Sequence, residues 1–239
     1  MESDDKNSNY VILITGTSRG IGRYLAEYYL AKGYFVIGCS RSKVDLDSEN
    51  YLHFCLDLCN HKELKDLFRE IKRKYGRLDI LINNAGLSSI NYALMLNYEN
   101  VQDLFKTNVI SNIFASTEAV KLMKRNNFGR IVNISSIHVP LASVGTSLYG
   151  TTKSSIEHFS RVLSKEISTY GITINNIGLS LVKDTNMVSE LSDQAIEEIS
   201  KNLSLSEFIS FEDISYCIDF FISKDAGFIT GQTIYTSGV

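Results

Sequence analysis

Tyr149 and Lys153 have the side chains and the spacing of a proton-transfer pair. They stand four positions apart, so a helix places both on one face. A free phenol has a pKa of about 10 and is a poor base at neutral pH, but a nearby ammonium favours the phenolate. The pair therefore predicts a phenol that can exchange a proton with a bound molecule.

The spacing by itself is not specific, because Tyr28 and Lys32 repeat it. The first pair differs in having Ser136 thirteen positions before its tyrosine, directly after an expected strand over residues 130–135. The carboxyl end of such a strand lies at the edge of a parallel sheet where ligands bind. Since Tyr28 lacks such a partner in the sequence, we interpret Tyr28 and Lys32 as ordinary helix residues.

A glycine-rich turn near the N-terminus predicts nucleotide binding. The segment Thr15-Gly-Thr-Ser-Arg-Gly-Ile-Gly22 follows an apolar run and opens a helix. Gly16 permits a tight turn, Gly20 lets the backbone approach a pyrophosphate, and Gly22 allows the helix to pack closely on the strand. The helix N-terminus also favours negative charge. The alternative is a tight turn that binds no ligand.

Short apolar runs alternate with segments of helical periodicity along almost the whole chain. Such runs suit strands buried on both faces of a parallel sheet, and their alternation with helices implies right-handed crossovers. We therefore expect an α/β fold with a doubly wound parallel sheet and helices on both faces. The expected strands cover residues 10–15, 35–39, 53–57, 79–83, 130–135, 173–177 and 233–236, and the expected helices cover 21–32, 64–75, 98–126, 149–169 and 212–223.

The composition is that of one globular domain. The 239 residues are 44% hydrophobic and 21% charged, and no linker divides them, so we expect a single domain over residues 1–239. Lys+Arg 24 against Asp+Glu 27 gives a net charge of −3, which favours neither nucleic acid nor anionic membranes. The polar start and the lack of a long apolar run predict a cytoplasmic protein. The four cysteines form no C-x-x-C pair, so we expect no metal site.

The regular alternation weakens in the polar segment from about Leu179 to Ser210. This segment follows an expected strand over 173–177, so it begins at the edge of the sheet where ligands bind. Segments in that position often close over a bound substrate. We therefore expect residues 179–210 to form a substrate lid.

Taken in order along the chain, these motifs resemble the short-chain dehydrogenase/reductase family in its short, single-domain form. The matching positions are the glycine turn, Asp57 after the third strand, Asn83-Asn-Ala-Gly86 after the fourth, Asn108, Ser136, Tyr149 and Lys153. The resemblance covers nearly the whole chain. It implies a Rossmann-type fold and an oxidoreductase that acts on carbonyls or alcohols with a nicotinamide cofactor.

The resemblance also implies roles for the matching residues. Tyr149 donates the proton, Lys153 holds the nicotinamide ribose, and Ser136 hydrogen-bonds the substrate oxygen in preference to its neighbour Ser135. Asn108 helps to organise a water-linked proton path. The implied catalytic residues are Asn108, Ser136, Tyr149 and Lys153, and the implied cofactor-binding residues are Gly16, Ser18, Arg19, Gly20, Ile21, Gly22, Ser40, Arg41, Asp57, Leu58, Asn84, Ala85, Gly86, Tyr149, Lys153, Val182 and Thr185. For Asn84, a purely structural role has equal weight.

The end of the second expected strand favours NADP(H) over NAD(H). An acidic residue there usually holds a ribose 2′-hydroxyl, whereas a 2′-phosphate requires positive charge. Ser40 stands in the position of the acid, Arg41 follows it, and Arg19 in the glycine turn adds a second guanidinium. The alternative is that Arg41 is merely solvated.

The chain departs from the family pattern after the strand over 173–177. Leu179 and Ser180 replace the usual Pro-Gly, so we expect a less rigid turn near the nicotinamide. Val182 keeps the expected backbone contact with the carboxamide. Thr185 lies one position later in the chain than the threonine of the family pattern.

Within the family, the chain is most similar to 3-oxoacyl carrier-protein reductases. The similarity rests on the glycine turn and on two segments, Phe128-Gly-Arg-Ile-Val-Asn-Ile-Ser-Ser136 and Gly171-Ile-Thr-Ile-Asn175. Such enzymes present basic residues to an acidic carrier, and the candidates for that patch are Lys121, Lys124, Arg125 and Arg130. The alternatives are a reductase of a sugar, nucleotide-linked sugar, steroid or polyketide carbonyl, and a nucleotide-binding protein without catalysis. We interpret His138 and His158 as surface or packing residues.

The resemblance further implies a homodimer or homotetramer. Long helices after the fourth and fifth strands commonly pair across two-fold axes in this family. The apolar residues that would allow such pairing are Ile113, Val120, Ile156, Phe159 and Leu163, with packing onto the sheet as the alternative.

Overall fold

The computed structural model describes residues 10–189 and 191–239, which form one parallel sheet of seven strands in the order β3-β2-β1-β4-β5-β6-β7. This order reverses next to β1, where the crossovers change from one face to the other, and it confirms the predicted doubly wound sheet. The strands are β1 (Val11–Thr15), β2 (Phe35–Ser40), β3 (Tyr51–Cys55), β4 (Ile80–Asn83), β5 (Gly129–Ser136), β6 (Ile172–Leu179) and β7 (Thr233–Tyr235).

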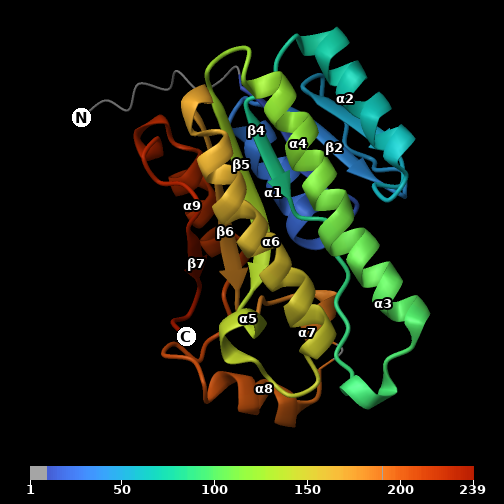
Figure 1. The fold of residues 1–239 in the computed structure, drawn as a ribbon, viewed down its shortest axis with the longest axis vertical. Coiled ribbons are helices and arrows are strands. Elements are labelled where there is room, and N and C mark those ends of the chain that lie inside the picture. The colour runs from blue at the N-terminus through green and yellow to red at the C-terminus, as the bar shows by residue number, and fades with distance from the viewer. Residues whose placement is uncertain (1–9, 190) are drawn as a thin grey trace.

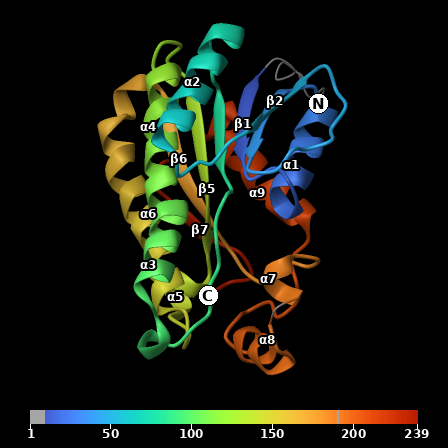
Figure 2. The same ribbon diagram turned by 90° about the vertical axis from the view of Figure 1, so that its right-hand side faces the viewer.

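Helices cover both faces of the sheet (Figures 1 and 2). One face carries α2 (His61–Tyr75), α4 (Ser111–Met123) and α6 (Ser147–Glu166), and the other carries α1 (Gly20–Ala31) and α9 (Phe211–Ile222). The remaining helices, α3 (Tyr98–Leu104), α5 (His138–Leu141), α7 (Asn186–Ser189) and α8 (Asp193–Ser200), lie toward the carboxyl ends of the strands. Among the described residues, no helix combines the length and apolar character needed to cross a membrane.

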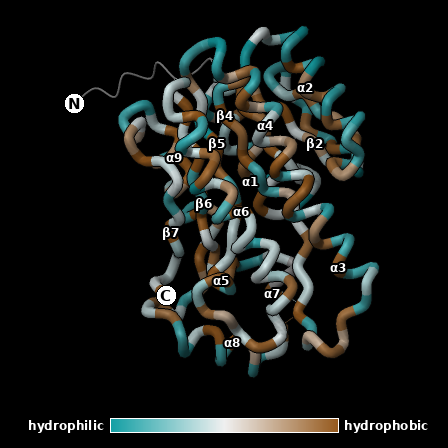
Figure 3. Tube along the Cα trace, viewed as in Figure 1, coloured by the Kyte–Doolittle hydropathy of each residue, from teal (hydrophilic) through white to brown (hydrophobic). Residues whose placement is uncertain are grey.

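The hydropathy pattern explains why these helices pack where they do (Figure 3). In α2, the residues Leu64, Leu67, Phe68 and Ile71 are buried against the sheet, while its charged residues form ion pairs such as Arg73 with Glu70 on the outer side. This is the period expected of an amphipathic helix. The central strands β1 and β4 are buried along their whole length and almost entirely apolar, as predicted for strands covered on both faces.

Two of the differences from the sequence prediction have a clear structural description. The third strand was expected over 53–57 but covers Tyr51–Cys55, because Val36 pairs with Tyr51 and Ser40 with Cys55. The expected helix over 98–126 is interrupted by a π-helical segment, Phe105–Ile110, that lies between α3 and α4. The pairing of β3 with β2 sets the boundary of β3. Apolar periodicity alone predicts neither this boundary nor the π-helical segment.

A row of asparagines crosses the centre of the sheet. Asn83 on β4, Asn133 on β5 and Asn176 on β6 are register partners, and all three are buried. Asn83 Nδ2 donates to Asn133 Oδ1 at 2.8 Å, and Asn133 Nδ2 donates to Asn176 Oδ1 at 3.1 Å and to Ser160 Oγ at 3.0 Å. Buried amides are tolerated in a core when their hydrogen bonds are satisfied in this way.

We expect Asn133→Leu to lower the free energy of unfolding by about 3 kcal/mol, because Asn83 on β4, Asn176 on β6 and Ser160 on α6 each lose one buried hydrogen bond. Urea unfolding followed by circular dichroism measures the loss. Asn126→Leu is the matched control, since Asn126 is exposed and its replacement should change stability by less than about 0.5 kcal/mol. Equal effects of the two substitutions would show that the asparagine row does not contribute.

Candidate active site

The predicted catalytic side chains meet in one cavity at the carboxyl ends of the strands. Ser136 ends β5, and Tyr149 and Lys153 lie on the first turns of α6, which packs on β5 and β6. All three line a cavity of about 350 Å³ together with Arg19, Ile21, Asn84, Gly86, Leu179, Val182 and Thr185. A larger open groove along the outer side of α6 contains none of the three catalytic candidates in its lining.

The environment of Tyr149 keeps its phenol protonated. Tyr149 is only 4% exposed, and burial raises its pKa to about 12, with a hydrogen bond from Ser136 acting in the opposite direction. The ring of His138 packs edge-on against the Tyr149 ring, with centroids 6.1 Å apart. His138 is therefore a packing residue, as predicted, while His158 is exposed. A protonated phenol is suited to donate a proton rather than to accept one.

Lys153 is buried beside Tyr149. Its Nζ lies 5.7 Å from the centroid of the Tyr149 ring and donates to the carbonyl oxygen of Ile134 at 2.8 Å. Burial lowers the pKa of Lys153 to about 8, because an ammonium loses hydration in the protein interior. The cation thus stands where it can act on the phenol and on a molecule bound in the cavity.

Asn108 lies in the π-helical segment and ties two parts of the site together. Its Nδ2 donates to Leu87 O at 2.8 Å and to Thr152 Oγ1 at 3.1 Å, and its Oδ1 accepts from Leu87 N at 2.8 Å. Thr152 lies on α6 between Tyr149 and Lys153. The π-helical turn is a known feature of functional sites, and here it presents Asn108 toward the catalytic helix.

The glycine turn has the geometry that its sequence predicted. Gly16 and Gly20 have φ values of +78° and +55°, in the left-handed region. A Cβ on Gly22 would lie 2.2 Å from Gly16 O, so only glycine allows α1 to pack so closely on the turn. A Cβ on Gly20 would meet nothing within 4 Å. The backbone at Gly20 is therefore open to a ligand, whereas Gly22 is closed in by protein.

The rim formed by the ends of β1 and β2 is basic and hydroxylic. Arg19, Ser18 and Arg41 are exposed there, and Ser40 Oγ donates to Ser42 O at 2.7 Å. The sequence analysis missed His53, whose Nε2 lies 3.2 Å from Ser40 Oγ. The contact between His53 and Ser40 depends on the parallel pairing of β2 and β3, so no local pattern in the sequence predicts it.

The remaining candidates for cofactor contacts lie on loops at the same edge. Asp57 and Leu58 follow β3, where Asp57 Oδ1 accepts from Cys59 N at 2.9 Å. Asn84 Nδ2 donates to Thr15 O at 2.9 Å, and the backbone of Ala85 donates to Thr15 Oγ1 at 3.0 Å. The side chain of Asn84 is thus used to brace the glycine turn.

The turn that replaces the family's Pro-Gly is tied to the end of the chain. Ser180 N donates to Thr236 Oγ1 at 2.8 Å, and the Ser180 and Ser237 hydroxyls lie 2.7 Å apart. These hydrogen bonds tie the turn to the C-terminal segment, and the expectation of a less rigid turn stays a prediction. Thr185 Oγ1 donates to Val182 O at 2.9 Å, which folds the turn that follows.

Residues 179–189 and 191–210 lie over the carboxyl ends of the strands, where α7 and α8 form the lower part of Figures 1 and 2. Ile199 and Leu203 pack with Leu181 and Ile137 in a small apolar cluster beside the cavity. Ile199 is the buried residue of α8, and its polar neighbours face outward.

Two other expectations need correction, and the interpretation of Tyr28 and Lys32 as residues outside the active site is confirmed. Arg130 cannot belong to a basic docking patch, since it is 3% exposed and donates to the carbonyls of Gly129, Ser223 and Gly171. Ile156 and Leu163 cannot face a second subunit, because both are buried within one chain. Tyr28 and Lys32 do more than fill a helix surface: both bond Asp219 Oδ2, which joins α1 to α9 away from the cavity.

Glu157 is the most informative residue that the sequence analysis missed. It is buried, and it stands four residues after Lys153, the same spacing that separates Lys153 from Tyr149. The spacing of four residues could have predicted that Glu157 lies on the same face of the helix as Tyr149 and Lys153. The contacts of its carboxylate depend on two strands and could not be inferred from the sequence.

Comparisons with known proteins agree with this site. The family model described as short chain dehydrogenase matches residues 10–196. The 3-oxoacyl-[acyl-carrier-protein] reductase FabG of Haemophilus influenzae is 32% identical over 234 residues, which cover 95% of this chain and 96% of that protein. FabG of Rickettsia conorii is also 32% identical, over 229 residues that cover 95% of this chain and 94% of its own.

Solved structures show the same architecture. ElxO with NADP bound superposes with a TM-score of 0.86 at 28% identity, covering 95% of this chain and 96% of that one. A 4-hydroxyisoleucine dehydrogenase complexed with NADH superposes with a TM-score of 0.85 at 26% identity, and the match covers 96% of this chain and 98% of that one. The motif order, the arrangement of the cavity and these similarities lead to one conclusion: the chain belongs to the short-chain dehydrogenase/reductase family of oxidoreductases.

Proposed function

We propose that this oxidoreductase is an NADP(H)-dependent reductase that converts a carbonyl to a secondary alcohol. The observation that carries the proposal is the meeting of Ser136, Tyr149 and Lys153 in one cavity that also opens onto the glycine turn. Burial raises the pKa of Tyr149 to about 12, so the phenol keeps its proton at neutral pH and is available as a proton donor.

The residues at the glycine turn and at the rim fit a nicotinamide dinucleotide. The open backbone at Gly20 and the N-terminus of α1 suit a pyrophosphate. Exposed Arg19 and Arg41, next to Ser40 in place of an acid, support a 2′-phosphate on the adenosine ribose. We assign cofactor contacts to these residues and to Ser18, Ile21, Asp57, Leu58, Ala85, Gly86, Val182 and Thr185.

In this proposal the bound nicotinamide supplies the hydride, and the chain handles the oxygen and the proton. Ser136 donates a hydrogen bond to the carbonyl oxygen and orients it. Tyr149 transfers its phenolic proton to that oxygen as negative charge develops there. Lys153 holds the nicotinamide ribose and stabilises the resulting phenolate. Asn108 bonds Leu87 and Thr152 and thereby fixes the start of α6. We assign it a part in the path of water molecules that returns a proton to the Tyr149 phenolate.

The first candidate substrate is a 3-oxoacyl thioester. Apolar side chains wall the cavity opposite the polar groups, namely Leu87, Ile90, Ile137, Leu181, Val188 and Leu191. They suit an acyl chain, and the similarity to FabG supports the same class. The segment 179–210 supplies three of these residues, so we assign it the role of substrate lid.

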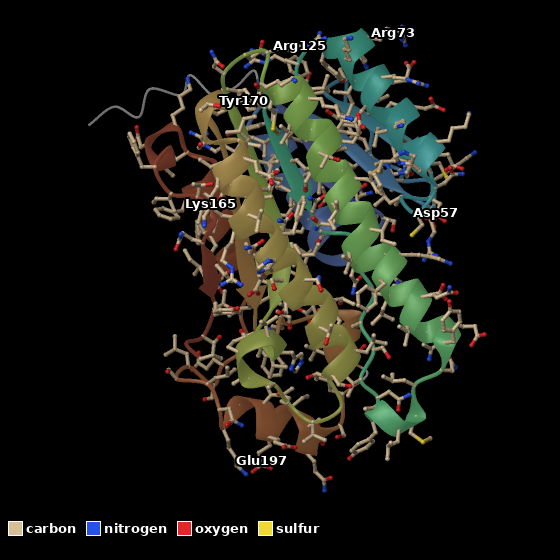
Figure 4. All side chains as sticks on the ribbon, viewed as in Figure 1. Asp57, Arg73, Arg125, Lys165, Tyr170 and Glu197 are labelled. Atoms are coloured by element: carbon tan, nitrogen blue, oxygen red, sulfur yellow. The ribbon has the colours of Figure 1, made fainter. Side chains whose placement is uncertain are left out.

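A carrier protein would need a basic docking surface elsewhere than first expected. Lys121, Lys124 and Arg125 are exposed, but they lie at the end of α4 next to the start of β5, whereas Ser136 ends that strand (Figure 4). Arg19 and Arg41 are basic residues on the side of the cavity, and we assign both to the cofactor. The thioester itself, rather than its carrier, is therefore the substrate to test first.

The test follows the loss of NADPH and NADH absorbance with a short 3-oxoacyl thioester. Oxidation of NADPH that exceeds that of NADH supports both the reaction and the cofactor. If NADPH binds and is not oxidised, the thioester is the wrong substrate, and sugar and polyketide carbonyls are tested next. Binding without turnover across a broad carbonyl panel would instead indicate a nucleotide-binding protein without catalysis.

We also expect a homodimer or homotetramer at micromolar concentration. The apolar residues Ile110, Phe114 and Val162 are exposed on α4, its preceding π-helical segment and α6, and contact with another subunit would cover them. Multi-angle light scattering measures the mass in solution. A single species of about 27 kDa, the mass of one chain at 26.8 kDa, would contradict this expectation.

A further inference from the structure

A buried carboxylate lies one helical turn beyond Lys153. Glu157 is 7% exposed and shares the inner side of α6 with Tyr149 and Lys153, since the three residues are spaced four apart. Glutamate is almost never buried to this extent unless its charge is compensated. Its position next to the catalytic pair therefore requires an explanation.

Two hydroxyl groups from different strands hold this carboxylate. Ser135 Oγ donates to Glu157 Oε1 at 2.5 Å, and the Tyr235 hydroxyl donates to Oε2 at 2.7 Å. Ser135 precedes Ser136 on β5, and Tyr235 ends β7. Because each carboxylate oxygen accepts from a hydroxyl donor, the arrangement satisfies the ionised form of Glu157.

The sheet is shaped to allow the bond from Tyr235. Gly178 on β6 is the register partner of Tyr235, and a Cβ at Gly178 would lie 2.2 Å from Tyr235 Cδ1. The Tyr235 ring therefore lies across a position that only glycine leaves free. Without that space the hydroxyl of β7 could not reach a carboxylate on α6.

Glu157 is the anionic group that acts on Lys153. The Nζ of Lys153 bonds only a neutral carbonyl, that of Ile134, among the contacts described above. The titratable groups around Lys153 and Glu157 are Tyr149 on α6 and Tyr235 on β7, with Arg161 near Tyr235, while β5 contributes hydroxyls. Burial lowers the pKa of Lys153 to about 8, and the charge of Glu157 opposes that fall.

We propose that Glu157 is a positioning residue whose carboxylate, fixed by Ser135 and Tyr235, keeps Lys153 cationic in the buried floor of the active site. The inference rests on the proposed function, because a cationic Lys153 matters for holding the cofactor ribose and for stabilising the Tyr149 phenolate. The carboxylate itself does not line the cavity and acts through Lys153.

The test is the pH dependence of NADPH affinity and of kcat/KM in Glu157→Gln. In the wild type, both should decline as the pH rises through about 8, where Lys153 loses its proton. Without the opposite charge, the same decline should begin about one pH unit lower. At pH 8 the variant should bind NADPH and turn over about fivefold less well than the wild type, and near pH 6 the two proteins should converge.

Three further variants separate charge from structure. Glu157→Asp retains the charge and should restore most of the wild-type profile. Glu157→Leu is neutral and of similar size, so it should reproduce the glutamine profile, and it carries the test if the glutamine variant does not fold. Tyr235→Phe removes one hydrogen bond but keeps the carboxylate, so its shift should be smaller. Thermal unfolding is measured in parallel.

If Glu157→Gln loses NADPH affinity and kcat/KM by the same factor at pH 6 and at pH 8, the inference is overturned, because such a loss would show a purely structural role for Glu157. NADPH fluorescence reports binding without turnover. If the wild type binds NADPH but reduces no carbonyl, the substrate proposal fails while the binding profile still tests Glu157. If the wild type binds no nicotinamide dinucleotide at any pH, the proposed function and this inference fail together.

Discussion

Tyr149→Phe should lower kcat for carbonyl reduction by at least about a thousandfold while leaving the affinity for NADPH within about threefold. The substitution removes only the phenolic oxygen, which is the proton donor in the proposed reaction. The ring itself packs against His138 and lies near the Lys153 ammonium, and phenylalanine preserves both contacts. Steady-state kinetics measure the first effect, and fluorescence titration with NADPH measures the second.

Tyr28→Phe is the matched control for this substitution. Tyr28 has the same spacing to a lysine, but its hydroxyl bonds Asp219 between α1 and α9. Loss of that bond should cost about 1 kcal/mol of stability and leave kcat unchanged. Residual turnover of more than about a tenth in Tyr149→Phe would refute the role of Tyr149 as proton donor, whatever the cofactor affinity.

Arg41→Asp should weaken NADPH binding at least about a hundredfold and NADH binding less than about threefold. The guanidinium is exposed at the end of β2, beside Ser40, where an acidic residue would hold a ribose hydroxyl. The substitution removes the attraction for a 2′-phosphate and adds repulsion, while an aspartate can accept a hydrogen bond from a 2′-hydroxyl. Dissociation constants for both cofactors, measured at one salt concentration, give the ratio.

Arg125→Asp changes the net charge equally at a distant position. Arg125 is exposed near the start of β5, at the end of the molecule opposite α8 (Figure 4). We expect unchanged affinity for both cofactors in this variant. Equal losses of NADPH and NADH affinity in Arg41→Asp would mean that Arg41 does not read the 2′-phosphate, and the preference for NADP(H) would have to be abandoned.

Much of the molecule could be predicted from the sequence because the relevant signals are local. The alternation of apolar runs and amphipathic segments fixes the order of strands and helices, and parallel pairing then brings the carboxyl ends of the strands to one edge. The glycine turn and the spacing of Tyr149 and Lys153 are likewise short-range patterns. The cavity lining includes both, together with Ser136.

Other features depend on contacts between residues far apart in the chain. Arg130 has the sequence of a surface cation, but the turns at Gly171 and Ser223 lie beside it and supply carbonyl acceptors. The boundary of β3 follows its register with β2, and the turn at Leu179 and Ser180 is held by Thr236 and Ser237, which lie within hydrogen-bond reach of Ser180. Local periodicity contains no information about such partners.

The sequence by itself thus determined the family and the order of the elements, and it predicted side chains that meet in one cavity, since each is written in residues a few positions apart. Only the tertiary structure decided the electrostatic setting of those side chains. Glu157 meets Tyr235 across 78 positions of sequence, and the two make one unit only when β7 pairs with β6 and α6 packs on the sheet. Burial and long-range hydrogen bonds set the charge of Lys153, and both arise only on folding.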